Sequence, residues 1–170
     1  FASARKGLEG FAASRGLSLS DLHCTLLGLV LNTATGELAV GHIGDGLIGA
    51  LRRDGTAGPL VEPPATGQAG ETYVITQREW ESYLGVAAHS ATDAGELTAC
   101  FLMTDGVADD CSYPPPPDIF DRWARDIDRE VRADRPLPAT ATRLLNWLAN
   151  YEARGSWDDR TLVVILRQGD

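Results

Sequence analysis

The order in which apolar runs and amphipathic segments follow one another is the feature that most constrains this fold. Several apolar runs of strand length lie between residues 23 and 104, two segments with helical spacing follow, and a last run, TLVVIL, returns near the end. Strands first, helices after and a closing strand predict an α+β sandwich in which helices cover sheets. With 170 residues and 44% hydrophobic content, we expect one domain, residues 1–170.

The predicted strands are short apolar runs bounded by turn residues. NTATGE separates the first two runs, and Asp54-Gly55 follows the third, which indicates antiparallel hairpins. The stretch QREWESYL fits either a short helix or an irregular excursion. The runs are HCTLLGLVL, ELAVGHI, LIGALRR, LTACFLMT and TLVVIL, with TYVIT at residues 72–76 as a shorter strand.

Three segments are predicted to be helices. The first runs from Phe1 to about Arg15 and ends at Gly16, a residue suited to the position after a helix. Asp118 is placed to cap the second, and the third carries an apolar stripe that ends at Gly155. Their aromatic residues are most simply core contacts.

The charge and composition of the chain limit the classes of partner that we expect it to bind. Asp and Glu total 24 against 15 Lys and Arg, a net charge of -9, so we expect no attraction to nucleic acid or to anionic membranes. The longest apolar run, CTLLGLVL, is far shorter than the roughly 20 residues of a membrane-spanning helix. Three cysteines without CxxC spacing predict a reducing compartment and no zinc site, and hence a cytoplasmic protein.

Aspartates stand at the ends of three predicted strands. Asp45 follows AVGHIG, Asp105 follows FLMT with Asp109 one helical turn later, and Asp158 precedes the last strand. Each one alone is most simply a turn or cap residue. If the three loops converge on one edge of the sandwich, however, their carboxylates would suit a hard cation such as Mg²⁺ or Mn²⁺.

These stretches resemble an ordered set of motifs in one enzyme family. GHIGDG, FLMTDGVAD and GSWDDRTLVVI, preceded by DLHCTLLGLVLN, are similar to motifs of the metal-dependent PP2C (PPM) serine/threonine protein phosphatases, over roughly Asp21 to Leu166. The resemblance implies an α-β-β-α sandwich of two mainly antiparallel sheets flanked by helices. It also implies hydrolysis of phosphoserine or phosphothreonine on a phosphorylated protein substrate.

The same resemblance implies roles for the aspartates. Asp105 and Asp158 would be ligands of a two-metal centre that holds Mg²⁺ or Mn²⁺, and Asp45 and Asp109 would match acids of a further, weaker metal position, giving two or three ions in all. The cations would supply an activated water, so no phosphoenzyme is implied. No histidine is nominated as a catalytic acid.

The sequence also departs from the family pattern. The family's first motif, with its bridging aspartate, and its phosphate-binding arginine would both precede Phe1, so we expect an N-terminally incomplete domain from a longer parent chain. Gly46 stands where a serine is usual, and Asp159 where an asparagine is usual. An alternative is therefore a catalytically inactive pseudo-phosphatase or sensor domain that binds a partner.

Overall fold

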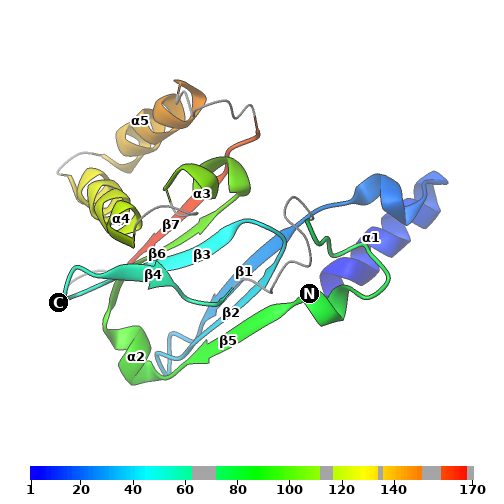
Figure 1. Cartoon of the computed structure of the whole chain (residues 1–170), viewed down its shortest axis with the longest axis horizontal. Coiled ribbons are helices and arrows are strands. Elements are labelled where there is room, and N and C mark those ends of the chain that lie inside the picture. Colours follow the sequence, from blue (N-terminus) through cyan, green and yellow to red (C-terminus); the bar gives the residue numbers. More distant parts are fainter. Residues whose placement is uncertain (63–71, 112–116, 134–135, 151–157, 168–170) are drawn as a thin grey trace.

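The computed structural model describes most of the chain, namely residues 1–62, 72–111, 117–133, 136–150 and 158–167. These residues form two antiparallel sheets with helices beside them (Figure 1). The first sheet has the order β1-β2-β5 and the second the order β4-β3-β6-β7. The strands are β1 (Leu26–Leu31), β2 (Leu38–Ile43), β3 (Leu47–Arg52), β4 (Ala57–Pro59), β5 (Gly85–His89), β6 (Leu97–Met103) and β7 (Leu162–Leu166).

The two sheets share an apolar core. Leu38 and Val40 of β2 belong to the same buried cluster as Ile48 and Ala50 of β3, together with Cys100 of β6. Because successive side chains on a strand point to opposite faces, the alternate residues of β3 and β6 are free to face away from this cluster. The central strands β3 and β6 are therefore buried on both faces, whereas Val163 and Ile165 of the edge strand β7 stay exposed.

Helices cover the outer face of the second sheet. The helices on this side are α3 (Asp105–Cys111), α4 (Pro117–Arg132) and α5 (Leu137–Asn150). Phe101 of β6 makes edge-on contacts with Phe120 and Trp123 of α4, at centroid distances of 6.4 Å and 5.3 Å. Gly49 makes room for this packing, because a Cβ atom there would lie 2.5 Å from the Phe120 ring. Strand β6 thus forms the centre of the core.

The first sheet is covered at one end by α1 (Ala2–Arg15). The Phe1 ring lies against Gly28 and Gly41 of neighbouring strands, where a Cβ on Gly41 would come within 2.4 Å of it. The side chain of Arg5, on α1, donates hydrogen bonds of 2.6 Å to the carbonyl oxygens of Ile75 and Gln77. The layer order helix, sheet, sheet, helix is that of the predicted α-β-β-α sandwich, which is confirmed.

Most predicted elements are confirmed. Gly16 ends α1 in the left-handed conformation, with φ 65°. The five longer strands are present as β1, β2, β3, β6 and β7, and α4 and α5 follow them. The end predicted for the third helix, Gly155, lies outside the described residues, and the side chain of Asp118, predicted as a cap, is likewise not described.

The segment 72–76 was predicted to be a strand, and this prediction is wrong. Its backbone instead enters a turn, in which Gln77 N–H donates to the carbonyl of Val74, while Ile75 N–H pairs with Cys24. QREWESYL contains a short 3-10 helix, Trp80–Tyr83. The elements that were not predicted are the strands β4 and β5, the helices α2 (Ala91–Gly95) and α3 (Asp105–Cys111), and a 3-10 helix at Leu19–Leu22. No helix in the described part of the chain is long and apolar enough to cross a membrane.

Truncating Phe101 should be costly, because its ring is fully buried between β6 and α4. We expect Phe101→Ala to lower the free energy of unfolding by about 3–5 kcal/mol in urea denaturation. Val30→Ala is the control, since Val30 is 70% exposed. Similar losses for the two variants would contradict the assigned core.

Candidate metal-binding site

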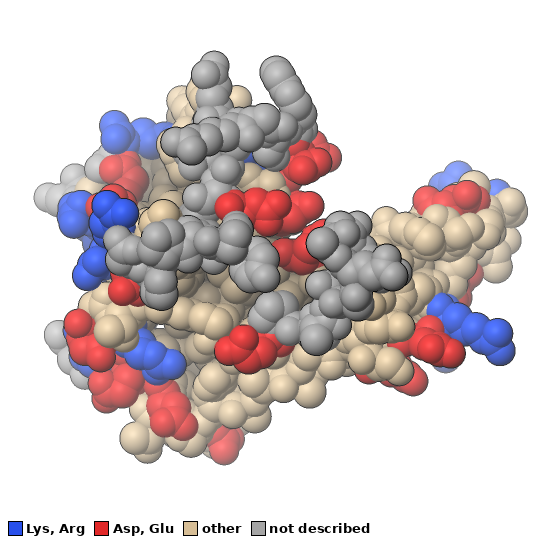
Figure 2. Space-filling model, viewed as in Figure 1, with Lys and Arg blue, Asp and Glu red and all other residues tan. Residues whose placement is uncertain are grey.

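The register of the second sheet brings three chain segments to one edge. Leu47 at the start of β3 pairs with Met103 at the end of β6, and Met103 pairs in turn with Leu162 at the start of β7. Asp45 lies two residues before Leu47, Asp105 lies two residues after Met103, and Asp158 lies four residues before Leu162. The three predicted aspartates therefore leave the sheet on the same side. Figure 2 shows acidic side chains gathered near the centre of one face.

Two glycines shape the turn that carries Asp45. Gly44 has a φ of 117°, a conformation that side chains rarely adopt. A Cβ atom on Gly46 would lie 2.5 Å from the carbonyl oxygen of Met103. The glycine found in place of the family's serine thus has a structural reason: a serine at position 46 would require the turn to move away from β6.

The segment that carries Asp158 is clipped to the end of β6. Thr104 Oγ1 accepts a hydrogen bond of 2.9 Å from Thr161 N–H and donates one of 3.1 Å to the carbonyl of Asp159. Thr104 N–H also donates to the carbonyl of Thr161, at 3.1 Å. Arg160 Nε donates to the carbonyl of Gly106, at 3.2 Å. Asp105 and Asp158 are therefore held on two backbones that are bonded to each other.

Gly106 permits this close contact. A Cβ atom on Gly106 would lie 2.8 Å from the carbonyl oxygen of Asp159 and 3.2 Å from that of Asp158. Gly106 therefore does more than permit a turn after Asp105, because the backbone of the segment that carries Asp158 packs directly against it.

The carboxylates interact electrostatically. Partial burial raises the pKa of Asp105, and the negative charges of Asp45 and Asp158 raise it further. The Gly106 N–H acts in the opposite direction through a hydrogen bond of 2.8 Å to Asp105 Oδ1. Asp45 also accepts a hydrogen bond from the hydroxyl of Thr72. The fold therefore concentrates negative charge at this edge, as a cation site requires.

The fourth predicted ligand, Asp109, lies on α3. It is exposed, one helical turn after Asp105, and the charges that raise the pKa of Asp105 are those of Asp45 and Asp158. Within the described residues, no three His, Cys, Asp or Glu side chains stand close enough together to hold one metal ion. The edge offers oxygen donors of the kind that Mg²⁺ and Mn²⁺ prefer, on backbones that lie side by side, rather than a closed ligand cage.

His42 lies near the end of β2, just before the turn that carries Asp45. Its side chain is fully buried, and among the described residues neither ring nitrogen has a hydrogen-bond partner that meets geometric criteria. Burial lowers the pKa of His42, and the Gly44 backbone and the Asp45 carboxylate oppose this effect. The net effect is that burial disfavours the charged imidazolium form of His42.

Sequence reasoning did not single out Thr104, Gly106 or Arg160. The only available signal was position: Thr104 and Gly106 flank Asp105 in the string TDG, and Arg160 comes two residues after Asp158 in the string DDRT. A hydroxyl or a guanidinium next to a carboxylate is common, and its backbone partner becomes visible only in three dimensions.

Replacing Gly106 by alanine should destabilise the protein, although alanine is the better helix former. The added methyl group would overlap the carbonyl of Asp159, so we expect Gly106→Ala to lower the free energy of unfolding by about 1–3 kcal/mol. Gly10→Ala is the matched control, because nothing lies within 4 Å of a Cβ there. It should raise stability by roughly 0.5–1 kcal/mol. A shift in the same direction for both variants in chemical denaturation would contradict the close contact.

Comparison with known proteins places this geometry in context. The family model described as "Protein phosphatase 2C" matches residues 2–149. No curated protein sequence gives a significant match. Among solved structures, a bacterial serine phosphatase carrying a point mutation is 13% identical with a TM-score of 0.49, and the match covers 86% of this chain and 52% of that one.

The phosphatase domain of the cell fate determinant SpoIIE from Bacillus subtilis is also similar. It is 13% identical with a TM-score of 0.48, over 94% of this chain and 64% of that one. A second structure of it, presoaked with Mn, is 12% identical with the same TM-score, over 99% and 66%. The chain thus spans between about half and two thirds of the length of these structures.

Proposed function

Because the protein phosphatase 2C model matches residues 2–149, the chain belongs to that family, and we propose that it hydrolyses phosphoserine or phosphothreonine on proteins with the help of Mg²⁺ or Mn²⁺. One observation carries the proposal. Asp45, Asp105 and Asp158 leave the sandwich at one edge, and the charges of the other two act on Asp105.

In this proposal, Asp105 and Asp158 are the principal ligands. They come from the end of β6 and the entry to β7, which are paired in register. Asp45, in the turn before β3, and Asp109, on α3, are assigned to the further, weaker position by the family resemblance. When bound, the cations supply an activated water and stabilise the phosphoryl oxygens during in-line attack.

The chain's own contribution is positioning. Thr104 and Arg160 bond the backbone around Asp158 to the backbone around Asp105, so that the two carboxylates are presented from rigid strand ends. Such outer-shell contacts fix ligand orientation and are worth a substantial factor in metal affinity. The phosphorylated side chain of a protein substrate would approach this exposed edge with its phosphate toward the cations.

Removing a principal ligand tests the proposal most simply. We expect Asp105→Asn to weaken Mn²⁺ binding in titration calorimetry by at least about 100-fold, more than loss of an outer-shell partner causes. Hydrolysis of a phosphoserine peptide should fall with it. Asp54→Asn is the control, because Asp54 carries the same charge in the exposed hairpin before β4. Unchanged Mn²⁺ affinity in Asp105→Asn would contradict the assignment, whereas Mn²⁺ binding without hydrolysis would favour a binding domain over an enzyme.

Thr104 provides a separate test of the positioning role. Thr104→Val removes the hydroxyl that joins the two acidic segments, so Mn²⁺ affinity should fall by about 10- to 100-fold while the fold is retained. Thr98→Val is the matched control at the other end of β6, where the hydroxyl donates to the carbonyl of Leu51 at 3.2 Å. Equal Mn²⁺ affinities in the two variants would show that Thr104 does not position the ligands.

A further inference from the structure

A second polar site lies at the opposite end of the second sheet. It is a hollow of about 300 Å³, and four of the residues that line it are arginines: Arg52, Arg53, Arg132 and Arg167. Thr98 lines it as well, at the beginning of β6, whereas the acidic edge lies beyond Met103 at the end of that strand. Met103 is five positions after Thr98, which is roughly 17 Å along the strand. The hollow is therefore distinct from the candidate metal site.

The concentration of arginines runs against the charge of the chain. The whole sequence holds 15 Lys and Arg against 24 Asp and Glu, yet four arginines and a single carboxylate, that of Asp128, line this one hollow. Like charges gathered in a small volume repel one another unless an anion compensates them. In Figure 2, several basic side chains lie on the left of the view, on the side of α4 and β4, with acidic side chains among them.

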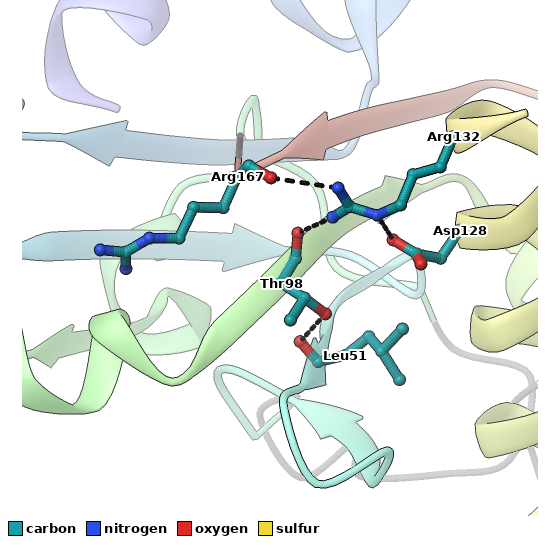
Figure 3. Close-up of polar contacts among 5 residues, drawn as sticks. All are labelled: Leu51, Thr98, Asp128, Arg132 and Arg167. Atoms are coloured by element: carbon teal, nitrogen blue, oxygen red, sulfur yellow. Dashed lines mark hydrogen bonds and ion pairs between the residues drawn. The ribbon is translucent and has the colours of Figure 1, made fainter. Parts of the chain in front are cut away.

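Arg132 lines the hollow and is held in place by three hydrogen bonds. Its Nε donates to Asp128 at 2.8 Å, and its two terminal nitrogens donate to the carbonyls of Thr98 and Arg167, at 2.8 Å and 3.2 Å. Figure 3 shows the Arg132 guanidinium held between these three groups. The same bonds tie α4 to the start of β6 and to the residue after β7. Arg132 is thus a fixed positive charge with little freedom to leave.

Arg53 and Arg167 both donate to carbonyl oxygens at the end of α2. Arg53 Nε donates to the carbonyl of Gly95 at 3.2 Å, and an Arg167 terminal nitrogen donates to the carbonyl of Ala94 at 3.3 Å. Figure 3 shows the side chain of Arg167 directed away from Arg132. Because a guanidinium carries five N–H groups, each of these arginines keeps donors beyond the bond described.

Arg52 adds an accessible charge. It is exposed at the end of β3, and none of the side-chain hydrogen bonds among the described residues involves it. Hydrogen bonds from Thr56 are the main reason that the pKa of Asp54 is lowered, and the positive charge of Arg52 lowers it further. The positive charge of Arg52 therefore also acts on the hairpin turn that follows β3, next to the hollow.

We propose that this arginine-lined hollow binds a phosphate dianion, either as free phosphate or on a phosphorylated side chain. A tetrahedral phosphate offers several strong acceptor oxygens, which match planar guanidinium forks from different directions better than a single carboxylate does. The volume lies at the lower end of the range for ligand pockets, which fits a group of this size. This inference does not depend on the proposed catalytic activity.

The test is titration calorimetry in the presence of EDTA, so that the acidic edge holds no divalent cation. Inorganic phosphate is titrated in one arm, and a phosphoserine peptide and its unphosphorylated form in two others. We expect binding of phosphate or phosphopeptide and none of the unphosphorylated peptide. Tighter binding of the phosphopeptide would identify a docking site for phosphorylated protein, and equal or weaker binding a site for the free anion.

Variants of the exposed arginines decide whether the hollow is responsible. Arg52→Gln should weaken binding about tenfold, the effect of one charge-assisted hydrogen bond, and the double variant with Arg53→Gln further. Arg129→Gln, which removes the same charge from an exposed site on α4, should leave it unchanged. Thermal unfolding verifies that each variant is folded. The proposal is overturned if the unaltered chain binds neither ligand, or if Arg52→Gln and Arg129→Gln bind alike.

Discussion

The antiparallel register of β3, β6 and β7 is the constraint on which the candidate site depends. Met103 is opposite Leu47 on one side and opposite Leu162 on the other, so the three acidic segments must leave the sheet together. A slip of one residue on either side would turn the core residues of that strand outward. The burial of Phe101 and Met103 therefore preserves the position of the aspartates as well as the stability of the sheet.

Two glycines allow the acidic segments that this register brings to one edge to approach one another closely. Gly46 lets the Asp45 turn lie against the Met103 carbonyl, and Gly106 lets the Asp158 segment lie against the first turn of α3. Thr104 and Arg160 then bond the segments across the gap. The negative charges of Asp45 and Asp158 oppose ionisation of Asp105, and this repulsion is what a bound cation would relieve.

Most of the strands and helices could be predicted from the sequence, because they follow from local patterns of apolar and turn residues. Apolar runs between turn residues identified β1, β2, β3, β6 and β7, and the helical stripes identified α4 and α5. β5 was missed because Gly85 to His89 holds small residues with a weak strand signal. Residues 72–76 were wrongly predicted to be a strand because they have a strand-like composition, although they form a turn from which the side chain of Ile75 is buried in the core. The aspartates could be assigned to strand ends, but their meeting depends on register and on backbone contacts between distant residues. The arginine-lined hollow was not predictable, since its residues come from four separate places in the chain.

Diffraction from crystals of the chain soaked with Mn²⁺, recorded for the anomalous signal of manganese, tests the central claim most directly. The account predicts an anomalous peak at the shared edge of β3, β6 and β7, with Asp105 and Asp158 as ligands. A peak elsewhere on the molecule, or none at an Mn²⁺ concentration that saturates binding in solution, would contradict it.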